Sequence, residues 1–341
     1  MIPGVQMSDD DRHAFLMIAY ENISHYYRFP FESFSSSTDE YSVRIGENRF
    51  SYDKIFINVQ PNEGDDASET FQMNLTLSSH IKIPDLSVIA PGTMGPFSWM
   101  PTLQCYHHVL SMKYDVSGTM QDKEDVTAVG YLEKDWGTEF PSIWIWGQAN
   151  QWQSNVSASL FFSFALIPWY FGFKFPGFLI IFEYNHEFYR FNTYLQSNVH
   201  NLETNQTTNE VSFDIYDVLF RYKLHVQTLV NPNENVNGAL LYGPRNQRME
   251  KYVKEILGRN IYFDVKLSKL ISNDRTMDDD SNDPFVRHGY TEEIVFEERA
   301  TNIALEINGD IDELKQLFEQ IYAHVFPWKF SLIRSLLYYF L

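Results

Sequence analysis

Short strand-like segments follow one another along most of the chain, and they constrain its fold more than any other feature. In these segments β-branched and aromatic residues alternate with polar ones or run continuously, and Gly, Asn, Asp or Pro bound them. Clear examples are 54–60, 69–77, 210–217 and 260–269. Evenly spaced strands are typical of barrels and sandwiches. No stretch supports a βαβ unit or a phosphate-binding loop, so we expect a mainly β fold.

Length, charge and cysteine content narrow the class of protein. The 341 residues suffice for two domains of roughly 150 residues. The formal net charge of −19 repels phosphate backbones, so we expect no nucleic-acid partner. The single cysteine, Cys105, excludes an internal disulfide and a cysteine-based metal site. The first residues lack the basic and apolar regions of a signal peptide, which predicts a cytoplasmic protein.

One apolar segment, 158–182, is long enough to span a bilayer and has a single charge, Lys174. Pro168 and Pro176 lie near its middle, where they break a helix. We therefore predict two buried strands, about 157–167 and 178–185, and keep the membrane span as the alternative.

Helix patterns occur near the two ends. Residues 9–27 read as a capping helix, and 310–325 place apolar residues at helical spacing after Asp310 or Asp312 as a cap. The apolar and aromatic stretch 326–341 predicts either packing onto the chain's own domain or peripheral contact with a membrane. The acidic stretch 273–284 reads as a solvated loop, because the spacing of a calcium-binding EF-hand is missing.

The densest group of chemically capable residues lies at 130–152. On a strand, Tyr131, Glu133 and Asp135 share one face, with the two carboxylates roughly 7 Å apart. If that face is buried, one carboxyl should keep its proton near neutral pH and could protonate an alkene or another weak base. A surface strand of ion pairs, with Lys134 serving a neighbour, is the competing interpretation.

The next strand places indoles and amides on one face: Trp144, Trp146, Gln148, Asn150 and Trp152. Indole rings can stabilise a developing cation, and buried amides tend to fix a polar ligand group. The alternative is an aromatic face covered by a second domain.

The histidines do not form a recognisable metal motif. His107 and His108 are adjacent, and adjacent side chains on a strand point in opposite directions. We therefore predict no metal site, and an inert thiol at Cys105.

The run from Gly130 to Gly137, followed by Phe140-Pro141, Trp144, Trp146, Gln148 and Asn150, resembles the signature of the tocopherol cyclase family. The flanking stretches 94–118, 157–168, 175–178 and 292–310 resemble that family's neighbouring segments, so the resemblance covers roughly 35–312. Plant members carry Asn at the position of Asp135, which makes Glu133 the stronger candidate for an acid.

The resemblance implies two lipocalin-like antiparallel β-barrels in tandem, with short terminal helices. We expect an N-terminal barrel at 1–155, a C-terminal barrel at 156–312 and an extension at 313–341. It also implies cyclisation of a prenylated hydroquinone or related isoprenoid, in which an alkene is protonated and a phenol oxygen attacks the cation, without cofactor or metal. Expected catalytic residues are Glu133 and Asp135. Expected substrate-binding residues are Tyr131, Trp136, Trp144, Trp146, Gln148, Asn150 and His107.

The expected partner is a hydrophobic small molecule, either a prenylated phenol or another isoprenoid. The alternative function is a non-catalytic carrier, in which the same aromatic lining binds an isoprenoid or lipid and releases it unchanged.

Overall fold

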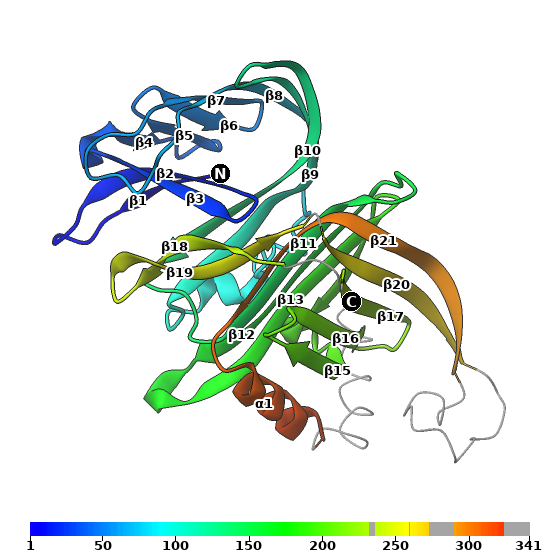
Figure 1. Cartoon of the computed structure of the whole chain (residues 1–341). Helices are drawn as coiled ribbons and strands as arrows, with labels where there is room; N and C mark the ends of the chain where they lie inside the picture. Colours follow the sequence, from blue (N-terminus) through cyan, green and yellow to red (C-terminus); the bar gives the residue numbers. More distant parts are fainter. Residues whose placement is uncertain (232–235, 259, 273–289, 324–341) are drawn as a thin grey trace.

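The structure, a computed structural model, describes residues 1–231, 236–258, 260–272 and 290–323. It is built from antiparallel strands in three sheets (Figure 1). A small sheet contains β1 (Ile2–Gln6), β2 (His13–Tyr20) and β3 (Ile23–Phe29). The second sheet has the order β10-β9-β8-β7-β6-β5-β4. Its strands are β4 (Phe34–Ser36), β5 (Ser42–Ile45), β6 (Asn48–Ser51), β7 (Lys54–Val59), β8 (Phe71–Ile81), β9 (Cys105–Met120) and β10 (Lys123–Gly137).

The third and largest sheet has the order β14-β13-β12-β11-β21-β20-β17-β16-β15, and β19 joins it beside β21. Its strands are β11 (Trp144–Trp152), β12 (Ala158–Pro168), β13 (Lys174–Tyr184), β14 (Glu187–Asn192), β15 (Asn198–Asn205), β16 (Glu210–Tyr216), β17 (Tyr222–Val230), β18 (Ala239–Arg245), β19 (Arg248–Leu257), β20 (Ile261–Ser272) and β21 (Tyr290–Asn308). The helix α1 (Ile311–Ala323) follows β21. The expectation of a mainly β, antiparallel fold is confirmed.

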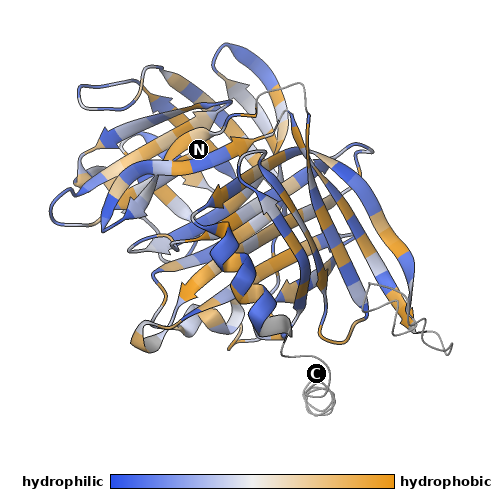
Figure 2. Ribbon diagram, turned by 60° about the horizontal axis from the view of Figure 1, so that its bottom comes forward, coloured by the Kyte–Doolittle hydropathy of each residue, from blue (hydrophilic) through white to orange (hydrophobic). Residues whose placement is uncertain are grey.

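Each large sheet curls around its own apolar core, and hydrophobic and hydrophilic residues alternate along its strands (Figure 2). The core of the largest sheet is rich in phenylalanine, including Phe162, Phe164 and Phe213, and Phe318 of α1 packs against it. The smaller core contains Leu16, Tyr27, Phe50 and Leu75, among others. Apolar side chains fill the cores of both large sheets. The polar and charged residues with the potential for chemistry lie outside these cores.

A third apolar cluster lies between β9 and β10 on one side and β12 and β13 on the other. It contains Val109, Met112, Phe161 and Ile181, with Tyr131 and Trp146 packed against it. Phe161 and Ile181 are the outward neighbours of core residues, because alternation along a strand sends successive side chains to opposite faces. The long strands β9 and β10 thus lie against the outer face of the largest sheet (Figure 1).

The predicted helix at 9–27 is wrong, because β2 and β3 form a hairpin there. All of β2 from His13 to Ile18 is buried, since Leu16 faces the smaller core and Met17 packs against β18 and β19. A strand buried on both faces shows no alternation, so its apolar run can be mistaken for a helix.

Two other predictions of secondary structure are confirmed. The two strands expected within 158–182 are β12 and β13. The helix expected at 310–325 is α1, with Asp310 accepting a hydrogen bond from the Glu313 amide.

Among the described residues, no helix combines the length and apolarity that crossing a bilayer requires. The expectations for 273–284 and 326–341 lie outside the described residues. The domain boundary at 155 stays a prediction; β11 pairs with β12 and β21 in the largest sheet.

Candidate active site

The candidate site is formed where β9 and β10 pair beside β11 and β12. Along this pair of strands, Gly130 of β10 lies opposite Tyr114 of β9. Two shifts in register follow, one on each side of Leu132, so that Asp135 lies opposite His107. Without these shifts Asp135 would face Val109 instead, two residues further along β9. These two shifts are β-bulges, and they place the Asp135 carboxylate beside His107 of the neighbouring strand.

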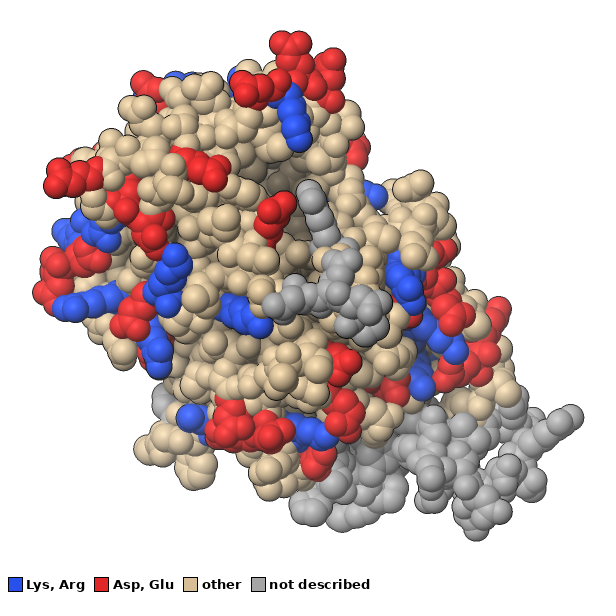
Figure 3. All heavy atoms as spheres, in the orientation of Figure 1, with Lys and Arg blue, Asp and Glu red and all other residues tan. Residues whose placement is uncertain are grey.

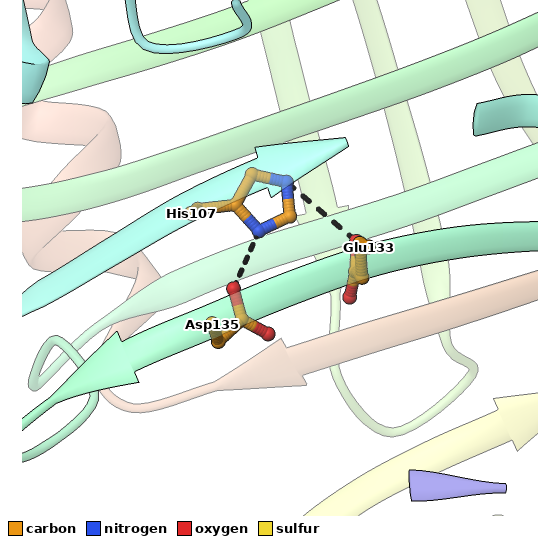
Figure 4. Close-up of side chains that lie close together, drawn as sticks. All are labelled: His107, Glu133 and Asp135. Carbon is orange, nitrogen blue, oxygen red and sulfur yellow. Dashed lines mark hydrogen bonds and ion pairs between the residues drawn. The ribbon is translucent and has the colours of Figure 1, made fainter. Parts of the chain in front are cut away.

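His107 lies between the two carboxylates that the sequence singled out (Figure 4). Its Nδ1 lies 2.7 Å from Asp135 Oδ1, and its Nε2 lies 3.6 Å from Glu133 Oε2. The Tyr131 hydroxyl donates a hydrogen bond of 2.6 Å to Glu133 Oε2. The side chains of His107, Glu133 and Asp135 remain 16%, 24% and 34% exposed, so a small molecule can reach them.

Aromatic rings shield the inner side of this group. The imidazole of His107 stacks on Phe161, with ring centroids 5.0 Å apart. Tyr131 meets the indole of Trp146 edge to face at 6.0 Å. Both supporting rings belong to strands of the largest sheet, β12 and β11. The site thus combines charged groups from one sheet with an apolar backing from the other.

These surroundings change the proton affinities of the site. Burial raises the pKa of Glu133 to about 7, assisted by the charge of Asp135 and opposed by that of His107. Burial alone would lower the pKa of His107, but the charges of Glu133 and Asp135 raise it to about 9. Near neutral pH the Asp135 charge therefore favours the imidazolium form of His107, and burial favours the protonated form of Glu133. This agrees with the expectation that one carboxyl of the pair holds its proton.

A second pair of carboxyl groups, Glu255 and Glu306, lies near this site, and the sequence patterns do not predict it. Glu306 of β21 lies opposite Trp146 on one side and opposite Glu255 of β19 on the other. Trp144 Nε1 donates a hydrogen bond of 2.7 Å to Glu306 Oε2. Burial and the charges of Glu255 and Glu133 hold the pKa of Glu306 well above its usual range. Only the long-range pairing of β21 with β11 and β19 brings this pair to the site, and no local motif signals it.

Three buried polar atoms at the site have no hydrogen-bond partner among the described residues: His107 Nε2, Trp146 Nε1 and Gln148 Oε1. The Trp146 indole approaches the Tyr131 hydroxyl but does not reach hydrogen-bonding geometry. Two of the atoms belong to donors and one is an acceptor. Unpaired buried polar groups are costly, so this set is suited to the polar end of a ligand.

The structure does not bring every predicted site residue to this place. Trp136 lies on the opposite face of β10, where it is 46% exposed and stacks on Tyr106. Trp144 packs against Phe140 and Tyr252, and its indole donates a hydrogen bond to Glu306. The expected role of Trp136 in substrate binding has no geometric support.

Two further residues of β11, Asn150 and Trp152, make structural contacts within the fold. Asn150 Nδ2 donates to the Gly130 carbonyl at 2.9 Å and so ties β11 to β10. The prediction that Trp152 shares a face with Trp144 and Trp146 is wrong. The pairing with β21 shifts around Gln151, and Trp152 consequently points into the core of the largest sheet.

A metal ion is the other species that the group could hold. One ligand atom each from His107, Glu133 and Asp135 lies within 4.8 Å of the others. However, Asp135 meets Nδ1 and Glu133 faces Nε2, so the two carboxylates lie on different sides of the ring. An ion on Nε2 would have Glu133 as its partner and Asp135 only as an orienting group. The prediction that no metal is used stays a prediction.

A cavity of about 290 Å³ lies away from this chemistry. Ile256 and Ile307 line it, and they are the chain neighbours of Glu255 and Glu306, so they point to the opposite face of their strands. Its volume is at the lower limit for small-molecule sites. We therefore place the candidate site at His107 and Glu133.

Comparisons with known proteins give little beyond a general likeness in fold. No protein-family model and no curated protein sequence matches the chain. The structure is similar to that of an AttH-like protein from Nitrosomonas europaea, with a TM-score of 0.40 and 12% identity over 86% of this chain and 80% of that one. It is also similar to kievitone hydratase from Nectria haematococca, with a TM-score of 0.39 and 7% identity over 91% and 88% of the two chains. Likeness at this level assigns no activity, and the resemblance to tocopherol cyclases is not confirmed by it.

Proposed function

We propose that the chain is an enzyme whose reaction begins when Glu133 protonates a carbon–carbon double bond of an isoprenoid substrate. The observation that carries the proposal is the carboxyl group of Glu133, which holds its proton to about pH 7 while it remains accessible. A neutral carboxylic acid beside apolar rings is suited to protonating a weak base. An ordinary surface glutamate would be ionised at the same pH.

The neighbouring groups have distinct roles in this proposal. Asp135 holds His107 by its Nδ1 and favours the imidazolium form. The Nε2–H of that imidazolium then points toward Glu133. It is buried and has no hydrogen-bond partner among the described residues, and in this proposal it donates to a substrate oxygen. Tyr131 positions Glu133 through its hydrogen bond. Trp146 and Tyr131 meet edge to face beside Glu133, and in this proposal a ring face stabilises the carbocation.

The proposed substrate class is a prenylated hydroquinone or a related isoprenoid phenol. The proton of Glu133 forms a new C–H bond at the less substituted alkene carbon, which leaves a tertiary cation. The phenol oxygen attacks that cation to close a ring, and the phenol proton returns to the Glu133 carboxylate. The product is an isomer of the substrate, and no electrons are exchanged with a cofactor. Gln148 Oε1, an acceptor without a hydrogen-bond partner in the described part of the chain, would hold the phenol hydroxyl before attack.

The test is incubation with a series of prenylated hydroquinones, followed by liquid chromatography and mass spectrometry. The proposal expects a product of unchanged mass and altered retention that resists oxidation to a quinone. Glu133→Gln should reduce its formation at least about 100-fold, because loss of general acid catalysis typically costs a factor of this size. Glu124→Gln, which changes an exposed glutamate of the same strand, is the matched control.

The other outcomes are also informative. A product heavier by one water would retain the protonation step but replace the phenol with water as the nucleophile. A ligand that binds and returns unchanged would refute the enzyme and favour an isoprenoid carrier. Equal turnover by the Glu133 and Glu124 variants would refute the assignment of the acid.

A further inference from the structure

Large apolar side chains protrude at one end of the molecule, around the turn between β12 and β13. We call this feature the aromatic tip and define it by its exposed residues, Leu86, Val88, Ile89, Trp99, Trp169, Phe171 and Phe173. Phe171 is 97% exposed and Val88 is 91% exposed. Single exposed apolar residues are ordinary on protein surfaces, but a group of this kind marks a site of interaction.

Two separate loops build the aromatic tip, and aromatic contacts hold them together. Phe175, at the base of the β12–β13 turn, packs edge to face on Trp169 at 5.6 Å. The same ring meets Phe97 of the other loop at 6.4 Å. Within that loop, Trp99 Nε1 donates to the Ile89 carbonyl at 3.1 Å. These contacts hold the two loops together, so the exposed apolar residues of the tip form one ordered surface.

The charge around the tip differs from that of the rest of the chain. No Asp, Glu, Lys or Arg occurs from 86 to 106 or from 140 to 173, although the net charge is −19. Exposed Lys174 adjoins the tip on one side, and Asp85, whose carboxylate binds the Gly92 amide, adjoins it on the other. The protruding lower left end of the molecule is accordingly mostly tan in Figure 3.

The loop that carries half of the tip also packs against the strands that form the candidate site. Met94 and Phe97 belong to the same apolar cluster as Tyr131 and Trp146. The His107 amide lies 3.1 Å from Met94 Sδ, and the hydroxyl of Tyr194, in the turn between β14 and β15, donates to the Thr93 carbonyl. The same loop therefore links the aromatic tip to the candidate site. Whatever binds the tip consequently lies close to the site.

We infer that the aromatic tip inserts into the interfacial region of a lipid bilayer. A lipid surface suits it because Phe171 and Phe173 project from a turn, as inserting residues must, while Trp99 and Trp169 can lie at the level of the headgroups. The absence of acidic groups from the tip removes the repulsion that the rest of this chain would meet there. This inference goes beyond the proposed function and does not require it.

Flotation with phosphatidylcholine vesicles tests the inference on the full chain. The wild-type protein should float with the vesicles, and the double substitution Phe171→Asn with Phe173→Ser should lower the apparent partition coefficient at least about tenfold. Asn suits position 171 because Phe171 has a φ of 61°. Ile294→Ser with Leu240→Ser removes two exposed apolar side chains elsewhere and should leave binding unchanged. Adding phosphatidylglycerol should weaken binding, since the chain carries a large negative charge.

A second measurement locates the contact without depending on affinity. Brominated lipids quench the fluorescence of tryptophans that enter the bilayer, and of the tryptophans within the described residues only Trp99 and Trp169 lie at the tip. Quenching should disappear in the Trp99→Phe, Trp169→Phe variant while flotation persists.

Absence of flotation by the wild-type protein would overturn the inference, and so would equal flotation of the tip and control variants. Retained quenching without the two tip tryptophans would also overturn it. Turnover of detergent-dissolved substrate separates this from the proposed function, because the tip variants should turn over such substrate normally. Binding to a protein in place of vesicles would likewise count against it.

Discussion

Replacing Asp135 with Asn removes one of the two charges that hold His107 as an imidazolium. The pKa of His107 lies at about 9, against an ordinary value of 6.5. The difference corresponds to about 3 kcal/mol in favour of the charged form. Glu133 shares this effect, and Asp135 is about one third exposed, so solvent screens its contribution. We therefore expect the substitution to remove about 1–2 kcal/mol, and to lower the pKa of His107 by about one unit.

The sign of the pH dependence follows from the direction of this shift. The folded-state pKa of His107 lies above its unfolded value. Its contribution to stability is therefore fully present below about pH 6.5 and is lost as the pH rises through about 9. The free energy of unfolding should decrease over this range in the wild-type protein, and less steeply in Asp135→Asn.

Two assays measure this effect. Urea unfolding at pH 6, 7.5 and 9 gives the free energy, with Asp115→Asn, an exposed aspartate of β9, as the control. Histidine NMR titration gives the pKa directly, with His107→Gln to assign the signal. A wild-type pKa at or below 6.5, or a value unchanged in Asp135→Asn, would refute the reasoning.

Three further predictions concern the groups around His107 and the packing of β11. Tyr131→Phe removes a hydrogen bond that lowers the pKa of Glu133. The pH at which activity is lost should therefore rise by about half a unit to one unit, and a fall would contradict the assignment. In Glu306→Gln a neutral side chain replaces a carboxyl whose pKa lies well above normal. Its melting temperature should exceed that of the wild type at pH 8.5 but not at pH 5.5, and a decrease at pH 8.5 would count against the buried pair. In Gly147→Ala the new Cβ would lie 2.4 Å from Cζ of buried Phe162. Urea unfolding should show a loss of about 1–3 kcal/mol, and a neutral result would mean that this contact is loosely packed.

The sequence predicts the strands of this protein better than it predicts their partners. Alternation placed Tyr131, Glu133 and Asp135 on one face, as the hydrogen bond and the ion pairs confirm. It could not place His107 between the carboxylates, because that position depends on two bulges in a long hairpin. Bulges depend on tertiary packing and leave no reliable trace in a local pattern.

The errors have a related physical origin. The apolar run of β2 resembles a helix pattern, because its two faces are buried against different partners. Alternation predicts the wrong face for Trp152, because the pairing of β11 with β21 shifts in register on both sides of Gln151. Glu255 and Glu306 come from strands far apart in the chain, and only the sheet order brings them together.

Solvent deuterium incorporation tests most directly whether Glu133 supplies the proton that starts a reaction. Prenylated hydroquinone is incubated with the enzyme in heavy water, and the product is analysed by mass spectrometry and NMR. The account predicts one deuterium at the carbon that Glu133 protonates, formed at least about 100-fold more slowly by Glu133→Gln and at the normal rate by Glu124→Gln. A cyclised product without deuterium, or a deuterated product formed equally fast by Glu133→Gln, would contradict it.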